Sequence, residues 1–219
     1  MNIIMTGSTS FVGAATVREL LRRGHTVTAI VRPKSSKLDT ILEGNEEALL
    51  SGHLLVTEND LSEPERLLEK VTKPQDVFCH FGWGGSGSAS RTDKALQEKN
   101  METSLETVRT AKTLGCKRFL FSGSQAEYGM HQDLITEDTV CEPKSLYGEA
   151  KLAMREKGEK LCGELGLRYI HARIFSAYGP GDHPWTLVES CLDAFLNNKE
   201  ISLGACTQNW NFLYIDDLA

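Results

Sequence analysis

The chain has 219 residues, of which 40% are hydrophobic and 25% charged, a composition typical of an ordinary globular domain. Its formal net charge of −6 argues against a surface for nucleic acid or for an anionic membrane, which would need clustered Lys and Arg. No apolar run approaches the ~20 residues of a membrane span, and no basic segment precedes an apolar one at the N-terminus. We therefore expect a cytoplasmic protein without a signal peptide.

The cysteine and histidine patterns predict neither disulfides nor a metal site. The six cysteines form no C-x-x-C pair, and the six histidines form no H-E-x-x-H motif. Several of the cysteines lie in apolar stretches, which is typical of buried, reduced thiols in a cytosolic protein.

Apolar strands alternate with amphipathic helices along the chain. The predicted strands are near-continuous apolar runs that cover residues 2–7, 26–31, 53–60, 76–82, 118–124 and 167–175. Apolar residues at helical spacing predict three long helices, which cover residues 13–21, 101–111 and 146–165. Buried strands that alternate with helices pair in parallel through right-handed crossovers, so the predicted fold class is α/β with a doubly wound parallel sheet.

The first predicted strand runs into a loop with two glycines, in the stretch TGSTSFVG. Gly7 at the strand end permits a tight turn, and Gly13 permits close packing of the following helix on the sheet. The free N–H groups at the start of this helix would face a pyrophosphate. Ser10 stands where such loops usually carry another glycine, and it is small enough to let a phosphate approach. The two glycines alone leave a dinucleotide loop and an ordinary strand–turn–helix equally open.

Basic residues follow the second predicted strand, in the stretch VRPKSSK. A dinucleotide-binding sheet that prefers NAD usually places Asp or Glu here, where the carboxylate accepts a hydrogen bond from the ribose 2′-hydroxyl. This chain has Arg32 at that position, with Lys34 and Lys37 behind it, and cations suit a 2′-phosphate. The pattern therefore favours NADP(H), with NAD(H) as the other cofactor to consider. The alternative interpretation is a solvated basic turn.

The stretch GWGGSGSASR, residues 82–91, has a strongly biased composition. It follows the fourth predicted strand and so lies at the carboxyl edge of the sheet, where ligands bind in this architecture. A substrate-facing loop and a flexible surface loop both fit this position.

The stretch SLYGEAK places Tyr147 and Lys151 four residues apart, on one face of a predicted helix. A tyrosine phenol has a pKa of about 10, and a neighbouring ammonium favours the phenolate. We therefore expect Lys151 to lower the pKa of Tyr147 toward neutrality, which would suit proton transfer at neutral pH. Such a shift needs roughly 3–4 kcal/mol of stabilisation of the phenolate by its surroundings. Ser124 ends the fifth predicted strand, so it would meet Tyr147 at the carboxyl edge of the sheet and contact the same substrate oxygen.

With these motifs in this order, the chain resembles the extended short-chain dehydrogenase/reductase family, the NAD-dependent epimerases and dehydratases that modify nucleotide sugars. The stretches that carry the resemblance are TGSTSFVG, NDLSEPERL, HFGWGG, SGSQAEYG, YGEAK, ARIFSAYGPGD and NFLYIDDLA. Each is weak evidence alone, but their combination is specific and spans the chain. The resemblance implies a Rossmann fold, with an NAD(P)-binding domain at residues 1–175. Residues 176–219 would begin a small C-terminal substrate region, which we expect to be truncated because family members continue well beyond this point.

The resemblance also implies roles for individual residues. Tyr147 would be the catalytic acid/base, Lys151 would hold the nicotinamide ribose, and Ser124 would orient the substrate. The implied cofactor-binding residues are Gly7, Ser10, Phe11, Val12, Gly13, Arg32, Asp60, Leu61, Phe81, Gly82, Trp83, Asn100, Ser122, Tyr147, Lys151 and Phe175.

Within this set, the residues of the glycine loop would wrap the pyrophosphate. Arg32 would meet the adenosine ribose, and Asp60 with Leu61 would meet the adenine. Residues 81–83 would line the cofactor channel, and Phe175 would pack near the nicotinamide.

The chain departs from the family pattern at several positions. Ser10 replaces a glycine, and Ser176 stands where an asparagine is usual. Sugar dehydratases of the family carry an Asp–Glu pair directly after the catalytic hydroxyl residue, and here these positions hold Gln125 and Ala126. Glu127 is adjacent, but in an extended segment its side chain would point to the opposite face from Ala126. We therefore expect no dehydratase chemistry.

The function that these observations predict is that of an NAD(P)-dependent epimerase or 4-ketoreductase acting on a nucleotide-activated sugar. The alternatives are a ketoreductase for a non-sugar substrate and a non-catalytic NAD(P)-binding protein. A homodimer is compatible with the resemblance. The sequence does not distinguish among the sugars and nucleotides.

Overall fold

The computed structural model describes residues 1–85, 89–207 and 209–219. Within these residues, six strands form one parallel sheet in the order β3-β2-β1-β4-β5-β6. Their bounds are β1 (Asn2–Thr6), β2 (Thr26–Val31), β3 (Leu54–Glu58), β4 (Val77–His80), β5 (Arg118–Ser124) and β6 (Arg168–Ile174). The strand order reverses between β1 and β4, and ligands of doubly wound sheets bind at the carboxyl ends of the strands at such a point. The predicted doubly wound α/β sheet, the Rossmann fold, is confirmed.

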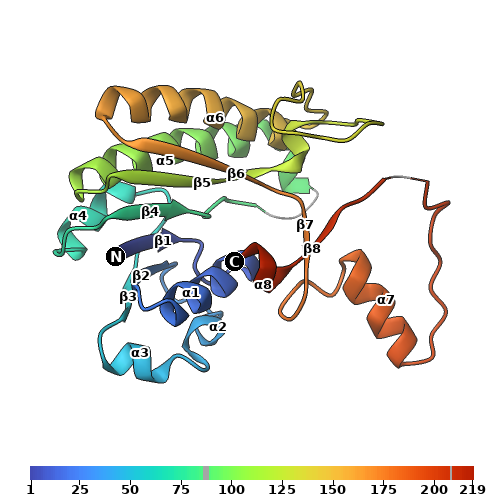
Figure 1. Cartoon of the computed structure of the whole chain (residues 1–219), viewed down its shortest axis with the longest axis horizontal. Coiled ribbons are helices and arrows are strands. Elements are labelled where there is room, and N and C mark those ends of the chain that lie inside the picture. The colour runs from blue at the N-terminus through green and yellow to red at the C-terminus, as the bar shows by residue number, and fades with distance from the viewer. Residues whose placement is uncertain (86–88, 208) are drawn as a thin grey trace.

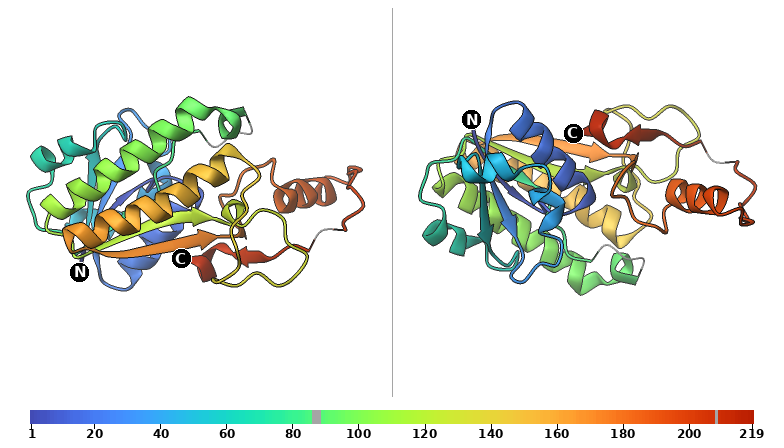
Figure 2. Two further views of the ribbon diagram at one scale, coloured as in Figure 1. Left: turned by 90° about the horizontal axis from the view of Figure 1, so that it is seen from above. Right: turned by 90° about the horizontal axis from the view of Figure 1, so that it is seen from below.

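Helices cover both faces of the sheet (Figure 1). One layer contains α1 (Phe11–Arg22), α2 (Asp39–Leu42) and α3 (Glu46–Leu50). The other layer contains α4 (Leu67–Lys70), α5 (Lys94–Thr113) and α6 (Leu146–Leu165). Figure 2 shows α5 and α6 running side by side across the sheet, and they contact each other along their length. The sheet is therefore buried on both faces, which leaves its edges and strand ends for chemistry.

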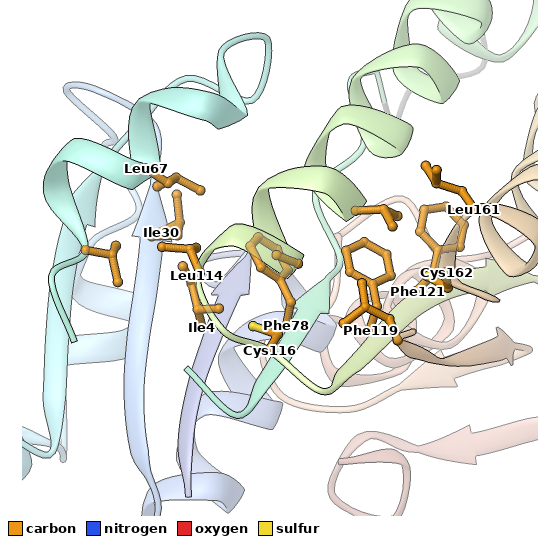
Figure 3. Close-up of a cluster of buried hydrophobic side chains, with 14 of the residues drawn as sticks. Ile4, Ile30, Leu67, Phe78, Leu114, Cys116, Phe119, Phe121, Leu161 and Cys162 are labelled. Atoms are coloured by element: carbon orange, nitrogen blue, oxygen red, sulfur yellow. The ribbon is translucent and has the colours of Figure 1, made fainter. Parts of the chain in front are cut away.

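The core under α5 and α6 is aromatic. Phe78, Phe119 and Phe121 project from adjacent strands and are fully buried, as Figure 3 shows. The rings of Phe78 and Phe119 stack with their centroids 5.5 Å apart. Burying one such side chain contributes about 1.5–3 kcal/mol. This packing makes the end of β5, which carries Ser124, a rigid support.

Local sequence signals define where the long helices begin. Ser10 caps α1, Asp93 caps α5 and Ser145 caps α6, each by accepting a hydrogen bond from the backbone N–H three residues further on. Gly166 ends α6 in the left-handed conformation, at φ +69°. Because α1 follows the end of β1, and α6 contacts the turn that follows β5, the first turns of both helices lie at the carboxyl edge of the sheet.

The C-terminal segment adds four elements that the sequence analysis did not predict. They are β7 (Ser176–Tyr178), α7 (Leu187–Leu196), β8 (Phe212–Tyr214) and α8 (Ile215–Leu218). The strands β7 and β8 pair in parallel as a separate two-stranded sheet. Figure 1 shows α7 standing away from the main sheet, whereas α8 packs on α1.

Candidate active site

The loop between β1 and α1 packs tightly against the end of β4. Gly7 has φ +71°, and a Cβ there would lie 2.7 Å from the backbone carbon of Phe81. A Cβ at Gly13 would overlap the carbonyl oxygen of Gly7. Both glycines are therefore required by close backbone approach. The turn that they form brings the N-terminus of α1, at Phe11 and Val12, to the crevice.

Ser10 performs a specific task in this loop. Its Oγ accepts a hydrogen bond from the N–H of Gly13 at 3.1 Å, which makes it the N-cap of α1. The hydroxyl hydrogen is not used in that bond, so Ser10 can still donate a hydrogen bond to a phosphate oxygen. A serine at this position is therefore compatible with the role that glycine has elsewhere in the family.

The segment after β4, residues 81–84, is held by contacts with Leu61 and with α5. Leu61 packs against Gly82, where a Cβ would lie 2.6 Å from the Leu61 side chain. Asn100 of α5 holds Gly84 through two hydrogen bonds, accepting from its N–H at 2.9 Å and donating to its carbonyl at 2.8 Å. Trp83 donates from its indole N–H to Gln97 at 3.0 Å. Asn100 and Trp83, both predicted to contact the cofactor, thus fix the segment after β4 against α5.

The predicted adenosine-binding residues lie at the ends of β2 and β3. Arg32 is exposed at the end of β2. Asp60 accepts hydrogen bonds from the backbone N–H and the hydroxyl of Ser62, at 2.9 and 2.7 Å. The pKa of Asp60 is lowered, mainly by these two bonds. The carboxylate is thus engaged within its own loop.

Ser124, Tyr147 and Lys151 come together at the carboxyl edge of β5. Lys151 is 2% exposed and donates from Nζ to the carbonyl of Ser122 at 2.7 Å. The same ammonium lies 4.1 Å from the centroid of the Trp83 ring. Tyr147 stands on the first turn of α6, edge-on to Trp83. The hydroxyl of Ser124 accepts from the N–H of Ala126 at 3.2 Å.

The expected effect of Lys151 on Tyr147 is wrong for this structure. Burial raises the pKa of Tyr147, and Glu127 raises it further, although the Ser124 hydroxyl and the Arg91 cation act to lower it. Lys151 lies 5.7 Å from the Tyr147 ring centroid, and burial lowers its own pKa to about 7. With a pKa of about 7, Lys151 is protonated only part of the time at neutral pH, so it does not stabilise a phenolate as a full cation would.

Arg91 is a site residue that the sequence analysis missed. It lies in η2 (Ala89–Thr92), and its Cζ is 4.9 Å from the centroid of the Tyr147 ring. This distance suits a cation–π contact. The only hint in the sequence was its place at the end of the biased segment. Residues 86–88 of that segment lie outside the described residues, so its predicted role as a substrate-facing loop stays a prediction.

Glu127 is turned away from the site, as expected, but for a different reason. Residues Gln125–Glu127 form a 3-10 turn, η3, rather than an extended segment. The Glu127 side chain is fully buried and pairs with His171 and Arg173 of β6. Neither Gln125 nor Ala126 carries an acid or base, so none of these three positions offers a titratable group to the substrate.

Beyond β6 the chain forms a cavity of about 430 Å³. Phe175 precedes it, with its ring 6.1 Å from that of Tyr128, and Ser176 begins its lining. Asp182, Trp210 and residues of β7 and α7 complete much of the wall. Ile174 pairs with Ser124 in the sheet, and the lining of the cavity begins two residues later, at Ser176.

Two kinds of feature are absent from residues 1–85, 89–207 and 209–219, the part of the chain that the structure describes. No helix there is long and apolar enough to cross a membrane. No group of three or more His, Cys, Asp or Glu side chains there could hold a metal ion.

Comparison with known proteins adds independent evidence. The model of the NAD dependent epimerase/dehydratase family matches residues 3–219. A UDP-glucose epimerase of Bacillus subtilis (strain 168), described as uncharacterised, is 27% identical, and the match covers 99% of this chain and 70% of that protein. A D-erythronate dehydrogenase of Cupriavidus necator is 30% identical over 80% of this chain and 53% of that protein. A crystal structure of UDP-glucose 4-epimerase with UDP-glucose from Thermotoga maritima matches with a TM-score of 0.84 at 24% identity, covering 100% of this chain and 71% of that one.

These matches agree with the geometry of the site. The chain spans 70% and 53% of the lengths of the two curated relatives. The structural match shows the fold, and the family model covers nearly every residue from β1 to α8. The chain belongs to the NAD dependent epimerase/dehydratase family, a family of enzymes.

Proposed function

We propose that this protein is an NAD(P)-dependent enzyme that epimerises or reduces one carbon of a nucleotide-activated sugar. The observation that carries the proposal is the meeting of Ser124, Tyr147 and Lys151 at the same carboxyl edge of the sheet as the glycine loop, with β4 between β1 and β5. Family membership supports the same class of reaction, because UDP-glucose epimerases are among the relatives.

The chain has the cradle that a dinucleotide needs. Cβ atoms at Gly7 and Gly13 would meet backbone atoms, and Ser10 keeps a hydroxyl hydrogen available at the N-terminus of α1. The residues proposed to hold the cofactor are those of this loop, the segment 81–83 and Lys151. When bound, the nicotinamide supplies the hydride acceptor or donor.

The side chains divide the remaining work. Tyr147, whose raised pKa keeps the phenol protonated, donates that proton to the sugar oxygen as the carbon is reduced and takes it back as the carbon is oxidised. Ser124 hydrogen-bonds the same oxygen and fixes its position. Lys151 has a pKa of about 7, so it exists in both protonation states near neutral pH. It holds the ribose, and it packs against the ring of Trp83 in the segment after β4.

The reaction class is tested with a panel of UDP- and dTDP-hexoses, with and without added NADPH. We expect epimerisation or reduction at one carbon, and no 4-keto-6-deoxy product. Elimination of water needs an acid and a base within hydrogen-bond reach, and Gln125 and Ala126 supply neither. Glu127 is held by Arg173. Accumulation of a 4-keto-6-deoxy sugar would contradict the proposal, and product without net cofactor consumption would identify an epimerase.

Arg32 provides the test of cofactor choice. The family model names NAD as the cofactor, so the preference for NADP(H) is a prediction that rests on Arg32 and on Lys34 and Lys37 behind it. We expect the wild type to bind NADP(H) more tightly than NAD(H), and Arg32→Asp to reverse that order, because the carboxylate repels a 2′-phosphate. Dissociation constants from titration of both cofactors measure this. Lys73→Asp is the matched control, with the same change of charge at an exposed lysine that precedes β4 and so lies away from the carboxyl edge of the sheet. If the wild type prefers NAD(H) and Arg32→Asp changes nothing, Arg32 is a surface residue.

A second candidate function is a dehydrogenase or ketoreductase for a substrate without a nucleotide. The observation that favours it is the 30% identity to a D-erythronate dehydrogenase. Adding small hydroxy and keto acids to the same panel separates the two. A protein that binds the cofactor but turns over no substrate would be the non-catalytic alternative.

We further propose that residues 176–219 begin the substrate region, because the 430 Å³ cavity is lined from this segment. The six free cysteines support a cytoplasmic location. The homodimer stays a prediction.

A further inference from the structure

A buried carboxylate lies directly behind Ser124. The Glu127 side chain is 0% exposed, and its Oε1 accepts a hydrogen bond from the Ser124 N–H at 2.7 Å. Oε2 accepts from Arg173 Nε at 2.9 Å, and His171 Nε2 lies 2.9 Å from both oxygens. A single carboxylate thus joins the last residue of β5 to two residues of β6.

Arg173 and His171, the two side-chain partners of Glu127, each contact a tyrosine as well. Arg173 donates to the Tyr128 hydroxyl at 2.7 Å and lies over the Tyr128 ring, with Cζ 4.4 Å from its centroid. The other ring nitrogen of His171, Nδ1, lies 2.9 Å from the hydroxyl of Tyr169. His171 and Arg173 are two residues apart on β6, so both point to the same face of the sheet.

The sequence around the catalytic serine leaves room for this arrangement. A Cβ at Gly123 would lie 2.7 Å from Glu127 Oε1 and would overlap the His171 ring. The glycine is therefore needed for the carboxylate to pass behind β5. Ser124 and Glu127 also form a capping box, in which the serine hydroxyl and the glutamate carboxylate each accept a backbone N–H of the η3 turn.

The surroundings of Glu127 favour its ionised form. Burial raises the pKa of Glu127, but the hydrogen bonds and charges of His171 and Arg173 and the N–H of Ser124 lower it below its ordinary value. An ionised acceptor makes the stronger hydrogen bond, so the bond to the Ser124 N–H is charge-assisted.

We propose that Glu127, clamped by Arg173 and His171, is a positioning residue that fixes Ser124 in the orientation needed beside Tyr147. Glu127 does not touch the substrate and acts only through the backbone of Ser124 and the turn that follows it. The inference rests on the proposed function, because it assigns Ser124 a role in turnover.

Two variants remove the support in different ways. Glu127→Asp keeps the charge but shortens the side chain by one methylene. The long side chain of Arg173 can move with the carboxylate, whereas the backbone of Ser124 moves less easily, so the hydrogen bond to Ser124 is the one that this variant weakens. The double variant Glu127→Leu/Arg173→Leu removes both charges at once and avoids leaving one of them buried and unpaired. If one of them does not fold, the other carries the test.

The control is Asp76→Asn, at the opposite end of the sheet. The Asp76 carboxylate also accepts a backbone N–H, from Asn2 at 2.8 Å, and it is remote from the catalytic edge. The substitution removes the negative charge from a carboxylate–backbone hydrogen bond without touching Ser124.

The experiment is a double-mutant cycle on kcat with Ser124→Ala. In the parent and in Asp76→Asn, we expect Ser124→Ala to lower kcat by roughly 10²-fold, as is typical for one positioned donor. In the Glu127 variants, kcat is already low, and Ser124→Ala should lower it by less than about twofold further, because non-additivity reports coupling between the two positions. The same factor in all backgrounds would overturn the inference and leave Glu127 a purely structural residue. No effect of Ser124→Ala in the parent would overturn it as well.

A second measurement separates this inference from the proposed function. In protein labelled only at serine, the Hα–Hβ couplings of Ser124 report its side-chain rotamer without any turnover. We expect one rotamer in the parent and averaged couplings in the Glu127 variants, and unchanged couplings would overturn the inference. If the parent turns over no substrate, the proposed function fails, while the couplings still test whether Glu127 positions Ser124.

Discussion

Replacing Tyr147 by Phe is expected to lower kcat by 10²–10⁴-fold, the usual contribution of a general acid or base, while cofactor affinity stays nearly unchanged. The phenylalanine ring retains the edge-on contact with Trp83 and removes only the hydroxyl. Steady-state kinetics on the first active member of the substrate panel, together with a cofactor titration, measure both effects. Tyr214→Phe is a matched control, because it removes the same hydroxyl group from β8 of the separate two-stranded sheet. Turnover retained in Tyr147→Phe would rule out this mechanism.

Replacing Lys151 by Met is expected to weaken cofactor binding and turnover together, and also to change how stability depends on pH. Burial lowers the pKa of Lys151 from 10.5 to about 7 in the folded protein without cofactor. Between these values the unfolded chain binds a proton that the folded chain lacks, so the free energy of unfolding rises with pH. The stability of the wild type relative to the variant should therefore increase by about 2 kcal/mol between pH 7 and 9.

Urea unfolding of both proteins without cofactor, at pH 7, 8 and 9, measures this difference. Buried thiols such as Cys79 and Cys162 also affect stability at high pH, because burial raises the pKa of each to about 12. They are present in both proteins, so their contribution cancels in the difference. Parallel pH profiles would show that Lys151 is not desolvated as the structure has it.

The main sheet could be predicted from sequence because each strand is a short, buried apolar run. The parallel pairing of the strands followed from the rules for strands that alternate with helices, whereas their order was not predicted. The helices α1, α5 and α6 were visible because their apolar spacing extends over many residues. The short helices α2, α3 and α4 have four or five residues each, too few for a periodic pattern. The pairing of Ser176 with Phe212 depends on contact between distant segments, which no local signal encodes.

The candidate site could be predicted in position but not in electrostatics. The spacing of Tyr147 and Lys151 placed both on one helix face, whereas the pKa values depend on burial that spacing does not reveal. The orientation of Glu127 was argued from an extended backbone. The pattern Ser124-x-x-Glu127 is a capping-box signature, however, and it could have indicated the turn. Arg91 reaches Tyr147 from a loop, and its position depends on tertiary packing.

The most direct test of the central claim is whether bound cofactor changes its redox state when a nucleotide sugar is added. Wild type, Tyr147→Phe and Tyr214→Phe are each loaded with NAD(H) or NADP(H), and the absorbance of the reduced nicotinamide is followed by stopped flow after UDP- or dTDP-hexose is mixed in. The account predicts a change of absorbance, transient for an epimerase and lasting for a reductase, with at least one sugar in the wild type and in Tyr214→Phe, and its near-complete loss in Tyr147→Phe. Cofactor that binds to the wild type but never changes its redox state with any sugar of the panel would contradict the account.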